Sequence, residues 1–300
     1  MAELTYRDAV AAGIAQEMAR DERVVFLGED IAAAGGVFKA TVGLLDKFGP
    51  KRVRDTPISE QAILGAAMGA AMTGLRPIAE IMFSDFLAVC WDIVANEIAK
   101  SRYMTNGQVQ MPLVIRTANG AGSRFGAQHS QSVENWAMMI PGIKVVAPAF
   151  PADVKGLIAA AVRDDDPVLI FEHAQLYNLE GELPEPCEVD IYSARVRRAG
   201  CDVTLITYGG SLGKTLAAAE QLASDGIDEF LHHFRGEADI DAAPVAGSVH
   251  LHCTDVAGEW TVRLADDTRY AGQWKDGQST GLGIREKPGV ERSEGNFVGE

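Results

Sequence analysis

Glu60 is the carboxylate whose place in the sequence best suits chemistry on a bound molecule. It follows the loop DTPIS and opens EQAILGAAMGAAM, a run of small residues that predicts a helix. A carboxylate at this place lies beside the first free backbone N–H groups and complements the helix dipole. Spacing alone favours that structural role, so a catalytic role for Glu60 depends on what surrounds it.

Two ring side chains follow predicted strands, where a ligand could bind. Phe86 comes after RPIAEIMF, so its ring either stacks on a ligand or fills the core. His129 lies in NGAGSRFGAQHSQ, which is too polar for a core segment, although a lone loop histidine is usually exposed and without function. His250 and His252 share one face of a predicted strand, but without a third ligand we expect no metal there.

Apolar strands alternate with helices along the first 180 residues. We expect a helix after a Thr5 N-cap, one long helix over FLAVCWDIVANEIAKSRYM, and buried strands at VVFLG, RPIAEIMF, MPLVIRTAN, IKVVAPA and PVLIFEHA. This alternation predicts an α/β domain whose parallel sheet has helices on both faces. Ligands of such sheets bind beyond the carboxyl ends of the strands, so the loops after Asp55, Phe83 and Thr117 are expected to form the site.

The composition argues against several kinds of partner. Acidic residues outnumber basic ones by 42 to 27, and the net charge of −15 disfavours nucleic acid and anionic membranes. The four cysteines form no CxxC pair, as expected for reduced thiols without a structural zinc site. No secretory signal, mitochondrial presequence or apolar run of membrane-spanning length is present. We therefore expect a cytoplasmic protein.

Several unlinked motifs in the correct order resemble one enzyme family. They are GEDIAAAGGVFKATVGLLDKFGPKRVRDTPISE, DTPISEQAILGAAMGAAMTGLRPIAEIMFSDF, AQHSQSVENWAMMIPGIKVVAP and ADVKGLIAAAVRDDDPVLIFEH. Over about residues 4–227 the chain resembles the β subunit of the thiamine-diphosphate-dependent decarboxylase component of 2-oxoacid dehydrogenases, of pyruvate, acetoin or branched-chain type. The resemblance implies a transketolase-like pyrimidine-binding domain over residues 1–180. It also implies oxidative decarboxylation of a pyruvate-like 2-oxoacid with acyl transfer to lipoamide.

The same resemblance assigns roles to individual residues. It implies that Glu60 hydrogen-bonds the aminopyrimidine of thiamine diphosphate and activates the cofactor, with Ile58 and Phe86 also binding it. It places His129 at the mouth of the active site as a catalytic residue that donates protons or orients the lipoyl group. A structural potassium ion is implied at backbone carbonyl groups, those of Leu113, Ala161, Val162, Asp164 and Asp166.

The partners also come from the resemblance. A complete thiamine enzyme carries a GDG motif for magnesium and the diphosphate, and this sequence has none. The resemblance therefore implies that an α subunit holds the magnesium and the diphosphate in an α2β2 heterotetramer, and that the chain alone is inactive. It implies an acyltransferase core with its lipoyl domain as a further partner. Gly65 and Gly69 share one face of the predicted helix, which is interpreted as an assembly surface.

The C-terminal third departs from this pattern. Residues 181–227 read as a linker and the truncated start of a transketolase C-terminal-like domain, in which the strand DVTLITY would have an unpaired edge. Residues 228–267 resemble a maleylpyruvate-isomerase-like fragment, and residues 268–300 resemble membrane-occupation-and-recognition-nexus (MORN) repeats, which form hairpins. The simplest interpretation is a chimera. The alternative function is a non-catalytic, fused scaffold protein with a vestigial thiamine domain.

Overall fold

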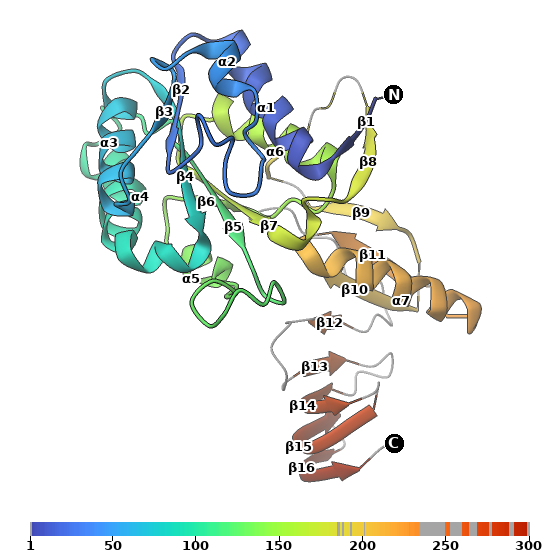
Figure 1. The fold of residues 1–300 in the computed structure, drawn as a ribbon. Helices are drawn as coiled ribbons and strands as arrows, with labels where there is room; N and C mark the ends of the chain where they lie inside the picture. The colour runs from blue at the N-terminus through green and yellow to red at the C-terminus, as the bar shows by residue number, and fades with distance from the viewer. Residues whose placement is uncertain are drawn as a thin grey trace. The chain divides into compact units, whose positions relative to one another are not determined.

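The computed structural model describes most of the chain, and it divides into two compact units at residues 192 and 193 (Figure 1). The described ranges are 2–184, 187, 189–192, 194–200, 202–227, 229–233, 250–252, 260–263, 269–275, 278–287 and 291–298. No helix within these ranges is both long enough and apolar enough to cross a membrane.

A six-stranded parallel sheet forms the centre of the first unit. Its spatial order is β3-β2-β4-β5-β7-β6, and every neighbouring pair runs parallel. The strands are β2 (Val24–Gly28), β3 (Val53–Asp55), β4 (Arg76–Phe83), β5 (Val114–Asn119), β6 (Lys144–Val146) and β7 (Val168–His173). Nearly all residues of the central strands are buried, as expected where both faces are covered. The predicted fold class is confirmed.

Helices cover the two faces of this sheet and enclose two apolar clusters (Figure 1). On one face, α1 (Tyr6–Arg20) and α6 (Pro151–Arg163) pack against the strands. On the other face lie α3 (Glu60–Met72) and the helical turns that follow β4. The predicted Thr5 N-cap is confirmed, because the Thr5 hydroxyl accepts a hydrogen bond from the backbone N–H of Asp8.

Shorter elements complete the first unit. They are α2 (Leu44–Phe48), α5 (Glu134–Met138), the 3-10 turn η3 (Ala174–Leu176), and the strands β1 (Ala2–Thr5) and β8 (Glu180–Leu183). β1 pairs antiparallel with β8. Three of the four residues of β8, 181–183, thus lie in the segment that the sequence pattern predicts to be a linker.

The long helix predicted after β4 is wound in three different ways. The chain forms a 3-10 helix η1 (Ser84–Cys90), then a π-helical turn η2 (Ile93–Ile98) and then α4 (Ala99–Met104). The buried residues Leu87, Cys90, Val94 and Ile98 still follow steps of three and four. Apolar spacing therefore located the buried face correctly but did not distinguish α-helix from tighter and looser windings.

The second unit contains an α/β layer. β9 (Arg195–Arg198), β10 (Val203–Thr207), the 3-10 turn η4 (Gly209–Ser211), α7 (Leu212–Ser224), β11 (Glu229–His233) and β12 (His250–His252) follow one another along the chain. The sheet order is β12-β10-β11-β9, and β10 runs parallel to both neighbours.

This layer corrects two sequence predictions. The sequence pattern predicts no strand after Asp228, but β11 lies there. Alternation of apolar and polar residues in EFLHH is weak, although Leu231 is fully buried. The edge of DVTLITY is not unpaired, because β10 has a strand on each side. His250 and His252 lie two residues apart on β12, and no cluster of three or more metal-ligating side chains occurs in the described part of the chain.

The end of the chain forms hairpins, as predicted for residues 268–300, and β13 adds a strand from the segment before them. β13 (Trp260–Arg263), β14 (Arg269–Lys275), β15 (Gln278–Lys287) and β16 (Glu291–Val298) make a four-stranded antiparallel sheet in sequence order. Much of the segment interpreted as maleylpyruvate-isomerase-like, namely residues 228, 234–249, 253–259 and 264–267, lies outside the described residues.

Candidate functional site

The loops that were expected to form the site do share one edge of the sheet. β3, β2, β4 and β5 are consecutive neighbours and run parallel, so their carboxyl ends face the same way. Glu29 directly follows β2, Thr56 follows β3, and Ser84 follows β4. Residues 120–131, which contain His129, follow β5. The geometry therefore brings together four loops that are far apart in the sequence.

Buried oxygen atoms without hydrogen-bond partners gather at this edge. Within the described residues there are five such side-chain atoms, namely Glu29 Oε1, Thr56 Oγ1, Asp85 Oδ2, Thr117 Oγ1 and Ser123 Oγ. All five belong to β5 or to the segments that directly follow these strands, which for Asp85 is the 3-10 helix η1. An unsatisfied buried polar group costs about 1–3 kcal/mol, so such a concentration points to a polar ligand that satisfies them.

Glu60 lies at the same edge as the first residue of α3 and is 8% exposed. No hydrogen bond or ion pair reaches its carboxylate from any residue that the structure describes. Burial, followed by the charge of Glu60, raises the pKa of Glu29 above its ordinary value, which shows that the two carboxylates lie near each other. Glu60 thus offers an unused acceptor to an N–H group of a ligand.

The two predicted ring residues meet in an aromatic cluster. The imidazole centroid of His129 lies 5.1 Å from the ring centroid of Phe86 and 4.9 Å from that of Phe83. In both pairs the ring planes are nearly perpendicular. Phe38 and Phe125 extend the cluster, with centroids 5.4 Å and 6.1 Å from Phe83. Phe86 and His129 are half-buried, so parts of both rings remain available to a ligand.

Ile58 differs from the other predicted cofactor residues because it is 84% exposed and does not belong to the core.

Glu29 and Asp85 are the residues that the sequence analysis missed, although both are less than 10% exposed and carry unpartnered oxygens. The signal was present, since each is an acidic residue just after an apolar strand. Nothing local separated it from an ordinary loop carboxylate.

Four of the five carbonyl groups predicted to hold potassium already have a hydrogen-bond donor. Arg76 donates from Nε to the Val162 oxygen at 2.7 Å and from Nη2 to the Asp164 oxygen at 2.6 Å. The Leu113 oxygen accepts from a backbone N–H at 3.0 Å, and the Ala161 oxygen accepts from another at 3.3 Å. A carbonyl oxygen has two lone pairs, so each keeps one for a cation. Four of these oxygens therefore keep an acceptor site, and the Arg76 guanidinium already brings a positive charge to two of them.

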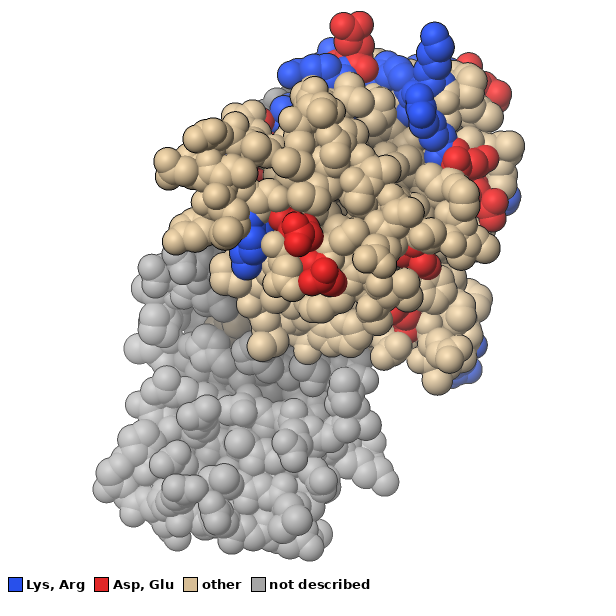
Figure 2. All heavy atoms as spheres, turned by 90° about the vertical axis from the view of Figure 1, so that its left-hand side faces the viewer, with Lys and Arg blue, Asp and Glu red and all other residues tan. Residues whose placement is uncertain are grey.

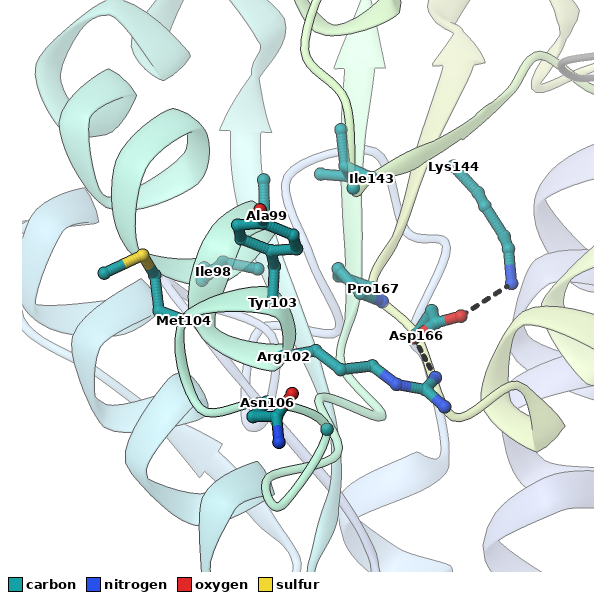
Figure 3. A pocket seen from close by; sticks show the side chains of 12 residues that line it. Ile98, Ala99, Arg102, Tyr103, Met104, Asn106, Ile143, Lys144, Asp166 and Pro167 are labelled. Carbon is teal, nitrogen blue, oxygen red and sulfur yellow. Dashed lines mark hydrogen bonds and ion pairs between the residues drawn. The ribbon is translucent and has the colours of Figure 1, made fainter.

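A pocket of about 770 Å³ is lined in part by Asp166, one of the residues predicted to hold potassium (Figure 3). Its lining includes Lys144 and Asp166, and the Asp166 carboxylate pairs with both Lys144 and Arg102. Lys144 begins β6 and Pro167 precedes β7, so the pocket lies at the amino ends of the strands. It is on the opposite edge from Glu60 and is not part of the candidate active site.

The helical side that carries α3, α4 and α5 has few charges. Figure 2 shows this side of the first unit, where uncharged side chains make up most of the surface. Its large exposed apolar residues are Met72, Leu75, Val89, Tyr103, Met104, Trp136, Met138 and Met139. Gly65 and Gly69 of α3 are exposed, and a Cβ atom at either would meet no backbone of this chain. Packing within the chain therefore does not require these glycines, whereas close approach by a partner would.

Comparison with known proteins agrees with this geometry. Residues 2–180 match the transketolase pyrimidine-binding domain, and residues 193–251 match the transketolase C-terminal domain. A solved structure titled "split gene transketolase, inactive beta4 tetramer" has a TM-score of 0.63 at 23% identity, covering 77% of this chain and 70% of that one, and supports the fold alone. The match of residues 193–251 to the transketolase C-terminal domain corrects one interpretation. Residues 228–251 continue that domain and are not a maleylpyruvate-isomerase-like fragment.

Curated relatives narrow the family. The chain is 46% identical over 263 residues to the 2-oxoisovalerate dehydrogenase subunit beta of Bacillus subtilis, covering 85% of this chain and 80% of the relative. It is 46% identical over 238 residues to an acetoin:2,6-dichlorophenolindophenol oxidoreductase subunit beta from the same organism, covering 75% and 70%. A mitochondrial pyruvate dehydrogenase E1 component subunit beta-1 from Arabidopsis thaliana is 41% identical over 252 residues, covering 82% and 69%. The chain therefore belongs to the family of β subunits of the 2-oxoacid dehydrogenase decarboxylase component.

Proposed function

We propose that this chain and an α subunit together decarboxylate a pyruvate-like 2-oxoacid and transfer the acyl group to lipoamide. The observation that carries the proposal is the Glu60 carboxylate, which no described residue hydrogen-bonds. It lies at the carboxyl edge of the sheet, where unpartnered buried oxygens and the Phe86–His129 pair also lie. Family membership supports it independently.

The residues at this edge fit the aminopyrimidine half of thiamine diphosphate. Glu60 can accept a hydrogen bond from a ring N–H and hold that proton, and the accessible part of the Phe86 ring can stack on a flat heterocycle. When bound, the cofactor supplies the nucleophilic carbon and the electron sink that decarboxylation needs. His129, half-buried beside Phe86, can hold or donate a proton at the entrance for the acyl acceptor. Ile58 is exposed enough to touch the cofactor or a partner.

The partners follow from what the chain lacks and from its surface. The sequence has no GDG motif, so we assign the diphosphate and its magnesium to an α subunit in an α2β2 assembly. The uncharged side over α3, α4 and α5, with Gly65 and Gly69 open to solvent, is the surface that we assign to assembly (Figure 2). The lipoyl domain of an acyltransferase core would then receive the acyl group.

Co-expression with the α subunit of a related 2-oxoacid dehydrogenase tests the proposal. We expect the purified complex to decarboxylate 2-oxoacids with a dye as electron acceptor, only when thiamine diphosphate and magnesium are present, and the chain alone to be inactive. Comparing pyruvate with branched-chain 2-oxoacids identifies the substrate. Calorimetric titration with the α subunit and with the cofactor provides the control, since the absence of heat in both would support the scaffold alternative instead.

We also propose that a potassium ion binds the second lone pairs of the carbonyls at the end of α6, those of Leu113, Ala161, Val162, Asp164 and Asp166. The support is that the structure gives the first four one hydrogen-bond donor each among the described residues, and that the carboxyl end of a helix favours a cation. We expect 100 mM KCl to raise Tm by about 3 °C over choline chloride at equal ionic strength. Equal Tm values in the two salts would contradict the proposal.

The end of the chain and the location of the protein stay as predictions. The resemblance of residues 268–300 to MORN repeats agrees with a hairpin sheet, which many unrelated sequences also form. A fusion origin and a cytoplasmic location likewise remain predictions from the sequence.

A further inference from the structure

One short segment contacts the loop of His129 at two separate places. Phe83 and Phe86 touch the imidazole ring at centroid distances of 4.9 Å and 5.1 Å. Between them, Asp85 accepts two hydrogen bonds on Oδ1 from Gln131, one from Nε2 at 2.8 Å and one from the backbone N–H at 3.3 Å. The same four residues therefore hold both the ring of His129 and the backbone two residues after it.

Gln131 is the residue that closes this loop. Its carbonyl oxygen accepts from the backbone N–H of Gly120 at 3.1 Å and from the Ser84 hydroxyl at 3.3 Å. Residues 120–131 therefore form a closed loop whose end is fixed by four hydrogen bonds, and Asp85 accepts two of them. His129 lies inside the loop, two residues before the point of closure.

The strength of the Asp85 contact follows from its surroundings. Asp85 is 7% exposed, so its hydrogen bonds to Gln131 are shielded from competing water. A hydrogen bond to a charged group contributes roughly twice as much as a neutral one. The second oxygen of Asp85 makes no hydrogen bond within the described residues, so only Oδ1 holds the loop.

We propose that Asp85 is a positioning residue for His129, acting through Gln131. This inference rests on the proposed function, in which His129 serves acyl transfer to the lipoyl group. Loss of the Asp85 contact leaves the His129 ring against Phe83 and Phe86 but removes two of the four hydrogen bonds that hold Gln131, so the backbone that positions the ring is less well fixed. A displacement of about 1 Å can reduce a rate about a hundredfold. Glu60 is on α3 and makes no hydrogen bond to Asp85 or Gln131.

The test uses the assembled α–β enzyme and two readouts, which are dye-linked decarboxylation and acylation of a lipoyl domain. We expect His129→Ala and Asp85→Ala each to slow lipoyl acylation by about tenfold or more relative to dye-linked decarboxylation. Asp85→Asn keeps the acceptor oxygen, so its ratio of lipoyl acylation to decarboxylation is expected to stay within about twofold of the wild-type ratio. Gln131→Leu, which removes only the side-chain donor, should give a smaller loss and serves if Asp85→Ala fails to fold.

A double-mutant cycle separates positioning from general damage. In His129→Ala, the further change Asp85→Ala should cost almost nothing, because its target is already gone. The inference is overturned if Asp85→Ala slows both readouts equally, if its effect adds to that of His129→Ala, or if Asp85→Asn is as damaging as Asp85→Ala. If His129→Ala itself leaves acylation unchanged, the proposed role of His129 fails, and this inference fails with it. If only Asp85→Ala is silent, this inference alone is wrong.

Discussion

Replacing Glu60 with glutamine is expected to lower kcat for decarboxylation by the assembled enzyme about a hundredfold or more, which is the range for loss of a positioned proton-transfer group. Glutamine keeps the shape of the side chain but cannot hold the proton. Folding should be little affected for two reasons. No group of the described chain hydrogen-bonds the Glu60 carboxylate, and its negative charge repels that of Glu29. The measurement is steady-state kcat with a dye acceptor, together with Tm.

A matched control makes this result specific. Glu22→Gln changes an exposed glutamate beyond the end of α1, remote from the carboxyl edge of the sheet, and should leave kcat unchanged. If Glu60→Gln keeps wild-type kcat while Tm is also unchanged, the assigned role of Glu60 is wrong. A parallel fall in kcat and Tm would instead indicate that Glu60 acts by supporting the start of α3.

The parts of the fold that were predictable are those where one local pattern determines the outcome. RPIAEIMF is mostly apolar apart from Arg76 and Glu80, and β4 occupies the same eight residues. The winding of residues 84–104 was not predictable, because 3-10, α and π turns all bury residues at steps of three or four. β11 was missed because EFLHH combines one fully buried leucine with two histidines, a pattern that resembles a loop.

The site was predictable only in part, for a related reason. Glu60 and His129 were found because long motifs surround them, whereas their spacing alone favoured structural roles. Asp85 and Gln131 are 46 residues apart, and their contact depends on the order of strands in the sheet. Sequence gives no direct access to such contacts. The same applies to Glu29, whose importance becomes visible only when Glu60 is found beside it.

Replacing Arg116 with methionine is expected to destabilise the chain by about 3–5 kcal/mol, the usual cost of breaking a buried ion pair from one side. Arg116 is 3% exposed and lies between two buried carboxylates. It donates to Glu172 from Nε at 2.8 Å and from Nη2 at 2.6 Å, and its Nη1 pairs with Glu80. Methionine fills a similar volume but leaves both carboxylates without a counter-charge. Chemical denaturation at pH 8 measures the loss.

Glu80 provides the matched control, and it also tests whether stability rises or falls with pH. Burial raises its pKa from an ordinary 4.5 to about 7, against the opposing effect of Arg116. A raised pKa means that the folded chain binds the proton more tightly, so stability falls as pH rises from about 4.5 to 7 and then levels off. Glu80→Gln stays neutral and leaves one Arg116–Glu172 pair, so it should cost little at pH 8 and flatten this dependence. Equal losses from Arg116→Met and Glu80→Gln at pH 8 would show that packing, rather than uncompensated charge, governs this part of the core.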